Sequence, residues 1–487
     1  MKFVQNDLKV ADQAVPDEAI DPRDLQGNIL RGFRSLRMIY ALIRFPEDPA
    51  QARAWVHEHL LAQRAPFKLT ESATQRESGN RPQFNFFLTV AGLERLGADA
   101  GRMASMDPAF LRGMRSDATR RLLADPAATD WALDYQRGWD AMLLVAYNPG
   151  DDGIVGAVEK AVAPLPDKKL ELGNVLDGDG HPMDAATAAR SPHRFEPFGY
   201  RDNISVTVFT VEQEEEDKIP SKVDWDPRRP LSAILCKDPF GSGFGSYFVY
   251  RKLKQDVLGF RRRVETIAGT LKERGTYLNQ LYASKGENSA YGIFAPGSTP
   301  SDQQIAQFVK GRIMGRLPSG ALPDGTTPEN YAFNFENDRA ASRCPFSSHI
   351  RKMNPRGQSG DLKSEVTIAR RGIPYGRSDT GQQAPETGIL FLCAQAGIRD
   401  QFERLQARMA NDRTPQMNAE PMPMPDQVAG HPTEVSDWGT MSRYQRFTTT
   451  IEADFSIWDL VTLQGGEYLF APSLSGLNAL ASKGGVR

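Results

Sequence analysis

The stretch RMIYALIRFPEDPAQARAWVHEHLLAQ, residues 37–63, decides the fold class of the first half of the chain. Residues 37–45 form an apolar run typical of a strand, and residues 48–63 carry apolar side chains at a helical period. The segments that follow are strand then helix (84–97), strand (141–150), helix (153–165) and strand (168–178). The order strand, helix, strand, strand, helix, strand is that of a ferredoxin-like α+β unit.

The second half of the chain repeats this pattern. Residues 245–269 and residues 387–412 each change from a strand-like run to a helical period, and 465–472 is a late strand candidate. Between the halves, 204–217 has the pattern of an alternating strand followed by an acidic run. Prolines at 220, 227, 230 and 239 then mark a linker. The sequence therefore predicts two similar layered domains.

Composition narrows the class of protein. The 487 residues include 59 basic and 61 acidic ones, a formal net charge of -2 that gives no overall attraction for nucleic acid or anionic membrane. The 3 cysteines are widely spaced without a CxxC pair, which argues against CxxC-based zinc, redox and haem-attachment motifs and suits a reducing compartment. We see no signal peptide, twin-arginine motif or membrane-spanning run, so we expect a cytoplasmic protein.

The chain has 6 histidines, and five of them are most simply solvated or capping residues: His57, His59, His181, His193 and His431. The sixth, His349, lies in RCPFSSHIRKMNPR (343–356). A single histidine without a nearby partner is often structural as well. Yet the basic residues that follow His349 are able to bind anionic carboxylates. The absence of a second histidine or cysteine nearby fits a metal whose other ligands come from a cofactor. An iron porphyrin fits, because its ring supplies the other nitrogen ligands and its propionates need cations.

The segment CPFSSHIRKMNPR (344–356) resembles the proximal haem segment of the dye-decolourising peroxidases. Other stretches resemble motifs of the larger, fungal-like branch of that family, in the expected order: DLQGNILRGF (24–33), FGYRDNIS (198–205), ARRGIPYG (369–376), GILFLCAQAGIRDQFERLQ (388–406) and TLQGGEYLFAPSLSGL (462–477). The similarity extends from about Asp24 to Leu477.

The resemblance implies an α+β fold of two ferredoxin-like domains with antiparallel sheets and flanking helices, of the dimeric α+β barrel superfamily type. We expect an N-terminal domain over 1–218, a linker over 219–242 and a haem-binding C-terminal domain over 243–487. It also implies one haem b per chain and a peroxidase that uses hydrogen peroxide to oxidise aromatic, phenolic or dye donors. The oligomeric state, monomer or homodimer, stays open.

The family's site residues map onto this chain by motif. His349 matches the axial iron ligand, Asp202 the distal aspartate that transfers a proton, and Arg370 the distal arginine that stabilises charge. The resemblance implies a second set of residues that contact the haem. Leu390 and Leu392 would contact it from the strand that lines the distal cavity. Arg351 and Arg356 would bind its propionates, and Asn203 would contact it from the distal loop. From the residues alone, Asp202 could equally be a turn aspartate.

Two departures from the family pattern bear on the site. Asn203 replaces the closing glycine of the family's G-x-x-D-G motif. If the family needs glycine here because the backbone adopts a positive φ, Asn is the mildest replacement. If it needs glycine because the backbone approaches the porphyrin closely, the amide side chain of Asn203 would crowd the site. Pro432 stands where relatives often carry an aspartate, so the carboxylate that would hydrogen-bond His349 is left unassigned.

Further alternatives concern neighbouring residues and the class of function. Arg371 competes with Arg370, and we prefer Arg370 from the motif. Tyr375 is a candidate electron relay to donors too bulky for the pocket, with Trp438 and Trp458 as further candidates; a relay predicts that Tyr375→Phe slows bulky donors more than small ones. The alternative function is haem storage or sensing with weak peroxidase activity, and Asn203 is the feature that favours it.

Overall fold

The computed structural model describes the greater part of the chain. The described residues are 1–151, 153–191, 193–220, 223–283, 297–322, 334–335, 344–345, 347–354, 356, 366–376, 386–411, 426, 428–430 and 457–482, without the side chains of 276–283 and 458. Among them, no helix is both long and apolar enough to span a bilayer. Predictions about Trp438, His431 and Pro432 lie outside the described residues, as does the side chain of Trp458.

The first half forms the predicted unit, and its elements follow one another as β3 (Arg37–Arg44), α1 (Pro49–Val56), β4 (Gln83–Leu88), β5 (Ala141–Tyr147), α6 (Gly153–Val162) and β6 (Asp167–Asn174). The strands pair antiparallel in the order β4-β5-β3-β6. Asp48 caps α1 by accepting a hydrogen bond from the Ala50 amide at 2.9 Å, an interaction that stabilises a helix by about 1 kcal/mol. The Trp55 indole donates to the Ala161 carbonyl at 3.0 Å and thereby joins α1 to α6.

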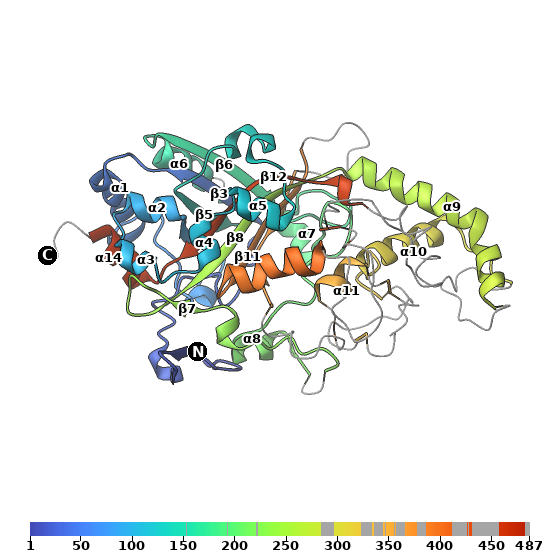
Figure 1. Cartoon of the computed structure of the whole chain (residues 1–487), viewed down its shortest axis with the longest axis horizontal. Helices are drawn as coiled ribbons and strands as arrows, with labels where there is room; N and C mark the ends of the chain where they lie inside the picture. Colours follow the sequence, from blue (N-terminus) through green and yellow to red (C-terminus); the bar gives the residue numbers. More distant parts are fainter. Residues whose placement is uncertain are drawn as a thin grey trace.

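The second half has the same strand order. Its elements are β8 (Phe244–Gln255), α9 (Val257–Ala283), α10 (Asp302–Met314), α11 (His349–Met353), β9 (Ala369–Arg370), β10 (Ile373–Tyr375), β11 (Gly388–Gln395), the π-helical turns η8 (Ile398–Glu403) and η9 (Leu405–Ala410), β12 (Val461–Ala471) and α14 (Leu474–Ser482). The strands pair antiparallel in the order β10-β11-β8-β12, and β9 also pairs with β11. Helices α9 and α10 lie side by side at the end of the molecule opposite α1 and α14 (Figure 1).

The strands of the two units form one continuous sheet, and the units also meet through their buried faces. A single pair, Phe470 with Leu88, joins β12 to β4. Tyr40 of β3 stacks on Tyr250 of β8 with ring centroids 5.6 Å apart, and both side chains are fully buried. Burial of such aromatic rings is a large part of the hydrophobic free energy that holds the two units together. The predicted fold, two ferredoxin-like units with antiparallel sheets and flanking helices, is confirmed.

The N-terminal motif 24–33 lies across both units. The Gln26 amide, fully buried, donates to the carbonyls of Phe86 and Pro472, which belong to different halves of the chain. Asp24 accepts a hydrogen bond from the Ser475 amide at 2.6 Å at the start of α14. This motif therefore helps to fix the two units relative to each other, because a buried amide left without its partners would cost free energy.

One element differs from the prediction. The strand expected at the start of 204–217 is absent: residues 204–210 make only single bridges, Val208 with Arg228 and Thr210 with Phe3. The segment bends because Asn203 and Ser205 have positive φ, which a strand does not allow. The acidic run after it is the short helix α8 (Val211–Glu216), capped by Thr210.

The division into 1–218, 219–242 and 243–487 stays a proposal. The proposed linker contains a short strand, β7 (Cys236–Lys237), which pairs with the start of β8.

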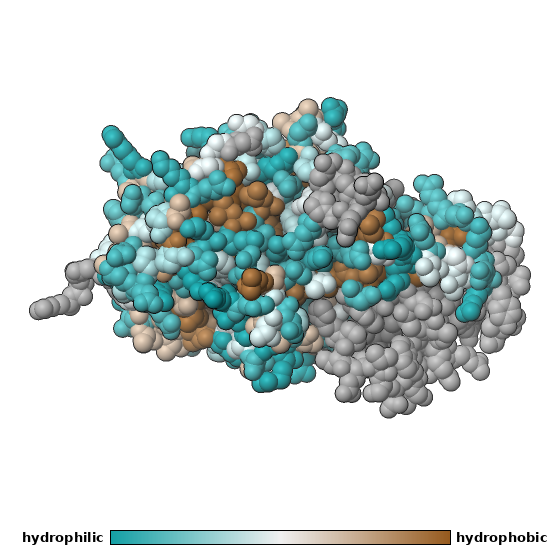
Figure 2. Space-filling view, turned by 90° about the horizontal axis from the view of Figure 1, so that it is seen from above, coloured by the Kyte–Doolittle hydropathy of each residue, from teal (hydrophilic) through white to brown (hydrophobic). Residues whose placement is uncertain are grey.

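The face of the molecule drawn in Figure 2 is mostly hydrophilic, with separate hydrophobic areas among the hydrophilic side chains.

Candidate active site

His349 is the first residue of the short helix α11 and points a ring nitrogen at a carboxylate. Its Nδ1 lies 3.0 and 3.2 Å from the two carboxylate oxygens of Asp426. The His349 side chain is 31% exposed, whereas that of Asp426 is 0% exposed. With Nδ1 facing the carboxylate, Nε2 is the nitrogen left to bind a metal.

Asp426 is held as a carboxylate by several donors. Its Oδ1 accepts hydrogen bonds from the amides of Val428 and Ala429 at 2.8 and 2.9 Å. Burial acts to raise the pKa of Asp426, but His349 and these amides outweigh it, so the pKa lies below the usual value of an aspartate. A charged carboxylate behind a metal-binding histidine fixes its tautomer and makes it a stronger ligand.

Sequence reasoning missed Asp426. It lies in the Pro/Met-rich stretch 417–432, 77 residues after His349. The family pattern directed attention to the position after His431, where Pro432 stands. The available signal was an aspartate five residues before His431, with Val428 and Ala429 following it two and three residues later.

The two predicted propionate partners have protein partners of their own. Arg351 is buried, donates to the Cys344 carbonyl at 2.5 Å and lies with its guanidinium 4.7 Å from the Phe335 ring centroid. Arg356 is fully buried, lies 4.2 Å above the Trp225 ring and donates to the Ser205 hydroxyl. Their contact with propionates stays a prediction.

The hydrogen bond from Arg356 to Ser205 joins the segment that carries His349 to the distal loop. Ser205 follows Asp202 by three residues, and Arg356 follows His349 by seven. The loop is also attached through the Arg201 amide, which donates to the Pro318 carbonyl at 3.0 Å. Segments far apart in the sequence are thereby brought to one place, as a site with a ligand on one side and acid-base groups on the other requires.

Asp202 lies in a sharply turning loop. Gly199 has φ 90, Asn203 has φ 61 and Ser205 has φ 63. The amide of Asp202 donates to the Arg194 carbonyl at 2.7 Å, and the side chain of Asp202 is 38% exposed. The positive φ of Asn203 favours the first explanation of the family glycine: this position needs a left-handed backbone, which Asn adopts more readily than other non-glycine residues.

Strand alternation separates Arg370 from Arg371. Arg370 opposes Cys393 across the strand pair β9–β11, so the next residue points to the other face of the sheet. Arg371 is buried there and donates to the carbonyls of Asn28 and Ile29 at 2.6 and 2.7 Å. Arg371 is therefore fully engaged in joining the N-terminal motif to the second sheet.

Arg370 instead reaches the distal loop. Its Nη2 donates to the Ile204 carbonyl at 3.0 Å, and its Nη1 lies 3.8 Å from the carboxylate of Asp202. The side chain is 52% exposed. The structure thus brings together the two residues predicted to act on the distal side, and it supports Arg370 over Arg371.

Leu390 and Leu392 lie on the other face of β11. Both are fully buried, and Leu390 pairs with Ile373, on the same face as Arg371. The face shared with Arg370 presents Ile389 and Phe391, which are partly buried. This placement argues against Leu390 and Leu392 as haem contacts and favours Ile389 and Phe391, which the motif comparison passed over.

Tyr375 also lies on the buried face, where the Lys252 ammonium is 5.1 Å from its ring centroid. Burial, followed by the charges of Glu386 and Glu171, raises the pKa of its phenol. Oxidation of the ring would therefore occur among protein groups rather than in solvent. The role of Tyr375 as an electron relay stays a prediction.

A cavity of about 780 Å³ opens beside the distal pair. Asp202, Asn203 and Arg370 line it, together with side chains from the N-terminal motif and from α8 and its C-terminal end. Such a volume is enough for a small aromatic molecule. Small molecules in this cavity would therefore lie beside Asp202 and Arg370.

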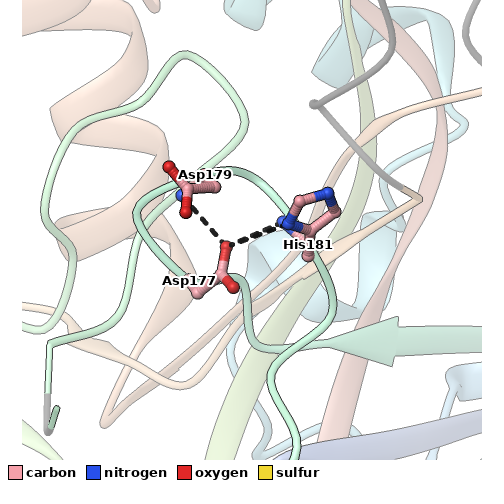
Figure 3. A group of neighbouring side chains, drawn as sticks. All are labelled: Asp177, Asp179 and His181. Atoms are coloured by element: carbon pink, nitrogen blue, oxygen red, sulfur yellow. Dashed lines mark hydrogen bonds and ion pairs between the residues drawn. The ribbon is translucent and has the colours of Figure 1, made fainter. Parts of the chain in front are cut away.

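A second group of metal-ligating side chains is accounted for by its turn. Asp177, Asp179 and His181 bring their ligand atoms within 4.8 Å of one another in an exposed loop (Figure 3). One oxygen of Asp177 accepts from the amides of Asp179 and His181 at 3.0 and 2.9 Å, as in an aspartate-stabilised turn. This agrees with the prediction that His181 is a solvated or capping residue, since its side chain is exposed.

Comparisons with known proteins identify relatives of this chain. Residues 242–420 match the family model for the C-terminal part of Dyp-type peroxidases. The multifunctional dye peroxidase DyP2 of an Amycolatopsis species is 30% identical over 485 residues, which cover 94% of this chain and 95% of that protein. A dye-decolorizing peroxidase of the fungus Auricularia auricula-judae is 29% identical over 517 residues, covering 95% of this chain and 87% of that protein.

Comparison with solved structures also finds Dyp-type peroxidases. The crystal structure of a DyP-type peroxidase from an Anabaena species superimposes with a TM-score of 0.71 at 26% identity, and the match covers 97% of this chain and 100% of that one. The suspected resemblance is thereby confirmed over nearly the whole chain. The chain belongs to the Dyp-type peroxidase family, and the enzyme is a peroxidase.

Proposed function

We propose that the protein binds one haem b per chain, with the Nε2 of His349 as the axial ligand of the iron. The observation that carries this is the contact of 3.0 Å between His349 and the buried carboxylate of Asp426, since such a carboxylate suits a metal-bound imidazole. The haem would supply the iron on which hydrogen peroxide is reduced. Arg351 and Arg356 remain the candidates for binding the haem carboxylates.

Asp202 and Arg370 would act on hydrogen peroxide, whereas His349 would hold the haem iron. The Asp202 carboxylate, within 3.8 Å of the Arg370 guanidinium, would take a proton from one peroxide oxygen and return it to the other. Arg370 stays charged, so it would stabilise the negative charge of the departing oxygen. Its hydrogen bond to the Ile204 carbonyl orients it for this role.

The proposed donors are phenols, other aromatic compounds and dyes. The support is that several full-length relatives are named dye or dye-decolorizing peroxidases. In the complete reaction two donor molecules each lose one electron and one proton, and hydrogen peroxide becomes two waters. Haem storage or sensing has less support, because the left-handed backbone of Asn203 weakens the argument that favoured it.

We keep the cytoplasm as the proposed location. All three cysteines, Cys236, Cys344 and Cys393, are free thiols. This suits a reducing compartment, where thiols persist. Measuring the enzyme in cytoplasmic and exported cell fractions tests this location, and recovery in the exported fraction would contradict it.

The decisive experiment is a visible spectrum of the purified protein after haem supplementation, before and after peroxide is added. We expect a Soret band for one haem per chain that changes on mixing with peroxide. His349→Ala should lose the bound haem or its axial bond, whereas His181→Ala, in the exposed turn, should keep both. A wild-type protein that binds no haem would contradict the proposal.

A further inference from the structure

Two consecutive π-helical turns, η8 and η9, extend over residues 398–410 and are joined at Arg404 (the orange helix in Figure 1). A π-helix mostly occurs as a single turn, and such turns are frequent at functional sites. The run packs against α11 through η9, so it lies beside the helix that begins with His349. Its hydrogen bonds lead in two directions, to the segment that carries Asp426 and to the first unit.

The second turn, η9, holds the segment of Asp426 at two points. The backbone amide of Asp426 donates to the Ala410 carbonyl at 2.8 Å. The side-chain amide of Gln406 donates to the Ala429 carbonyl at 2.7 Å. The backbone amide of Ala429 donates in turn to the Asp426 carboxylate at 2.9 Å. Gln406 therefore holds the residue whose amide binds the carboxylate that faces His349.

Gln406 is itself held from the first unit. Its side-chain amide also donates to the Asn411 side-chain oxygen at 3.1 Å. The Asn411 side-chain nitrogen donates to the carbonyl of Leu123 at 2.8 Å, and Leu123 is the last residue of α5 (Asp117–Leu123). A continuous chain of hydrogen bonds and one backbone residue therefore connects α5 to the ring of His349.

The first turn, η8, is fixed to the first unit by charge. The carboxylate of Glu403, at the end of η8, is 2% exposed. Both of its oxygens lie 2.6 Å from one guanidinium nitrogen of Arg112, the last residue of α4 (Pro108–Arg112), and the Tyr468 hydroxyl donates to it at 3.0 Å. A buried carboxylate without such partners would be costly, so this pairing fixes where the π-helical run lies.

We propose that Gln406 is a positioning residue for His349. It holds Ala429 so that the Asp426 carboxylate stays directed at the Nδ1 of His349, and a carboxylate fixed in this way makes the imidazole a stronger ligand. The inference rests on the proposed function, in which the Nε2 of His349 binds the haem iron. Through Asn411, the first unit thereby contributes to the strength of a ligand that belongs to the second.

Gln401 is the matched control, because it lies on the same run and has the same chemistry. Gln401 and Gln406 are 5% and 7% exposed. The side-chain amide of Gln401 donates to the carbonyls of Ala233, at 2.9 Å, and Thr367. These partners belong to segments other than the one that carries Asp426. Replacing either glutamine by methionine removes a buried donor and leaves backbone carbonyls to find other partners.

The test is resonance Raman spectroscopy of the reduced holoenzyme, which records the stretching band of the bond between iron and imidazole. In Gln406→Met this band should shift to lower frequency, and haem should dissociate roughly tenfold faster, because the Asp426 carboxylate is no longer held. Gln401→Met should keep the band and the dissociation rate of the wild type. Both variants should unfold at similarly reduced urea concentrations, so that a loss of stability by itself does not account for the band shift.

An unchanged band in Gln406→Met would overturn the proposal, and so would an equal shift in both variants. If Gln406→Met does not retain haem, Asn411→Ala gives the test. It removes the oxygen that orients Gln406 and should shift the band in the same direction by a smaller amount. An unchanged band in Asn411→Ala would then overturn the proposal. Wild-type protein that binds haem without this band would instead contradict the proposed function, because His349 would not be the ligand.

Discussion

The segment around His349 and the loop around Asp202 differ in how the chain holds their functional groups. The partner of His349 is a fully buried carboxylate bound by two backbone amides at 2.8 and 2.9 Å. Asp202 is 38% exposed, and its nearest charged partner, Arg370, is 3.8 Å away and 52% exposed. A metal ligand benefits from a hydrogen-bond partner that is shielded from water and held in one position. A group that transfers protons has to be accessible to peroxide and water. The difference therefore matches the different tasks proposed for the two sides.

The largest effect is expected from the exposed side. Asp202→Asn removes the proposed proton carrier and should slow the reaction with peroxide by about 10² to 10⁴-fold, while haem stays bound. Stopped-flow absorbance of the haem measures this rate. Asp217→Asn is the matched control, since that carboxylate lines the same cavity but pairs with Arg34. Rates that match the wild type would remove Asp202 from the mechanism.

On the buried side, Asp426→Asn should act through His349 and not on peroxide directly. Loss of the negative charge weakens the imidazole as a donor, so the iron reduction potential should rise, and haem affinity or activity should fall about 10- to 100-fold. A spectroelectrochemical titration measures the potential. Asp179→Asn, in the exposed turn, should leave the potential unchanged. If Asp426→Asn leaves it unchanged too, the carboxylate does not tune the ligand.

The distal loop should show its own pH dependence of stability through Glu196. This carboxylate accepts hydrogen bonds from the Tyr200 amide at 3.0 Å and from the Gln255 side chain at 2.9 Å, and burial raises its pKa from 4.5 to about 7. Between these values the folded state binds more protons than the unfolded state, so stability should fall as the pH rises through this window.

We expect Glu196→Gln to reduce this loss of stability, whose upper limit is about 3 kcal/mol. Urea unfolding at pH 5 and pH 8 measures it. Burial also raises the pKa of Glu467 to about 7, so both carboxyl groups contribute to the slope of the wild-type free energy of unfolding against pH. Glu467→Gln should therefore reduce the slope without altering the peroxide reaction. A Glu196→Gln slope identical to the wild type would show that this carboxyl is not protonated in the fold.

The smallest effect is expected at Asn203, whose φ is 61. Asn203→Gly should change the free energy of unfolding by no more than about 1 kcal/mol and leave activity close to the wild type, since both residues adopt this backbone. Asn203→Val should destabilise by about 1 to 3 kcal/mol, because a β-branched residue is strained there. Chemical denaturation measures both. A large gain in activity for Asn203→Gly would mean that the amide itself obstructs the site.

Much of the fold and part of the site could be predicted from the sequence. The strand and helix order of 37–178 follows from apolar periodicity, which depends only on neighbouring residues. The choice of Arg370 over Arg371 came from the family motif, and alternation along the strand explains why the two side chains point to opposite faces. The same alternation shows why the prediction of Leu390 and Leu392 has weak support: the motif identified the strand but not its face.

Other features could not be predicted, because they depend on contacts between distant segments. The pairing of His349 with Asp426 joins residues 77 positions apart, and no spacing rule connects them. The segment 204–210 has the alternation of a strand, yet positive φ at Asn203 and Ser205 bends it away from any sheet. Here tertiary contacts, including the one between Ser205 and Arg356, override local propensity.

The sequence by itself therefore determined the two layered α+β units, the singular position of His349 and the resemblance that identifies the family, because these depend on order and residue type. Only the tertiary structure decided which carboxylate supports His349, which face of β11 looks toward Arg370, and that cations from the first unit and from β9 line one cavity. The physical reason is that burial and charge act through space, between groups whose distance the chain order does not specify.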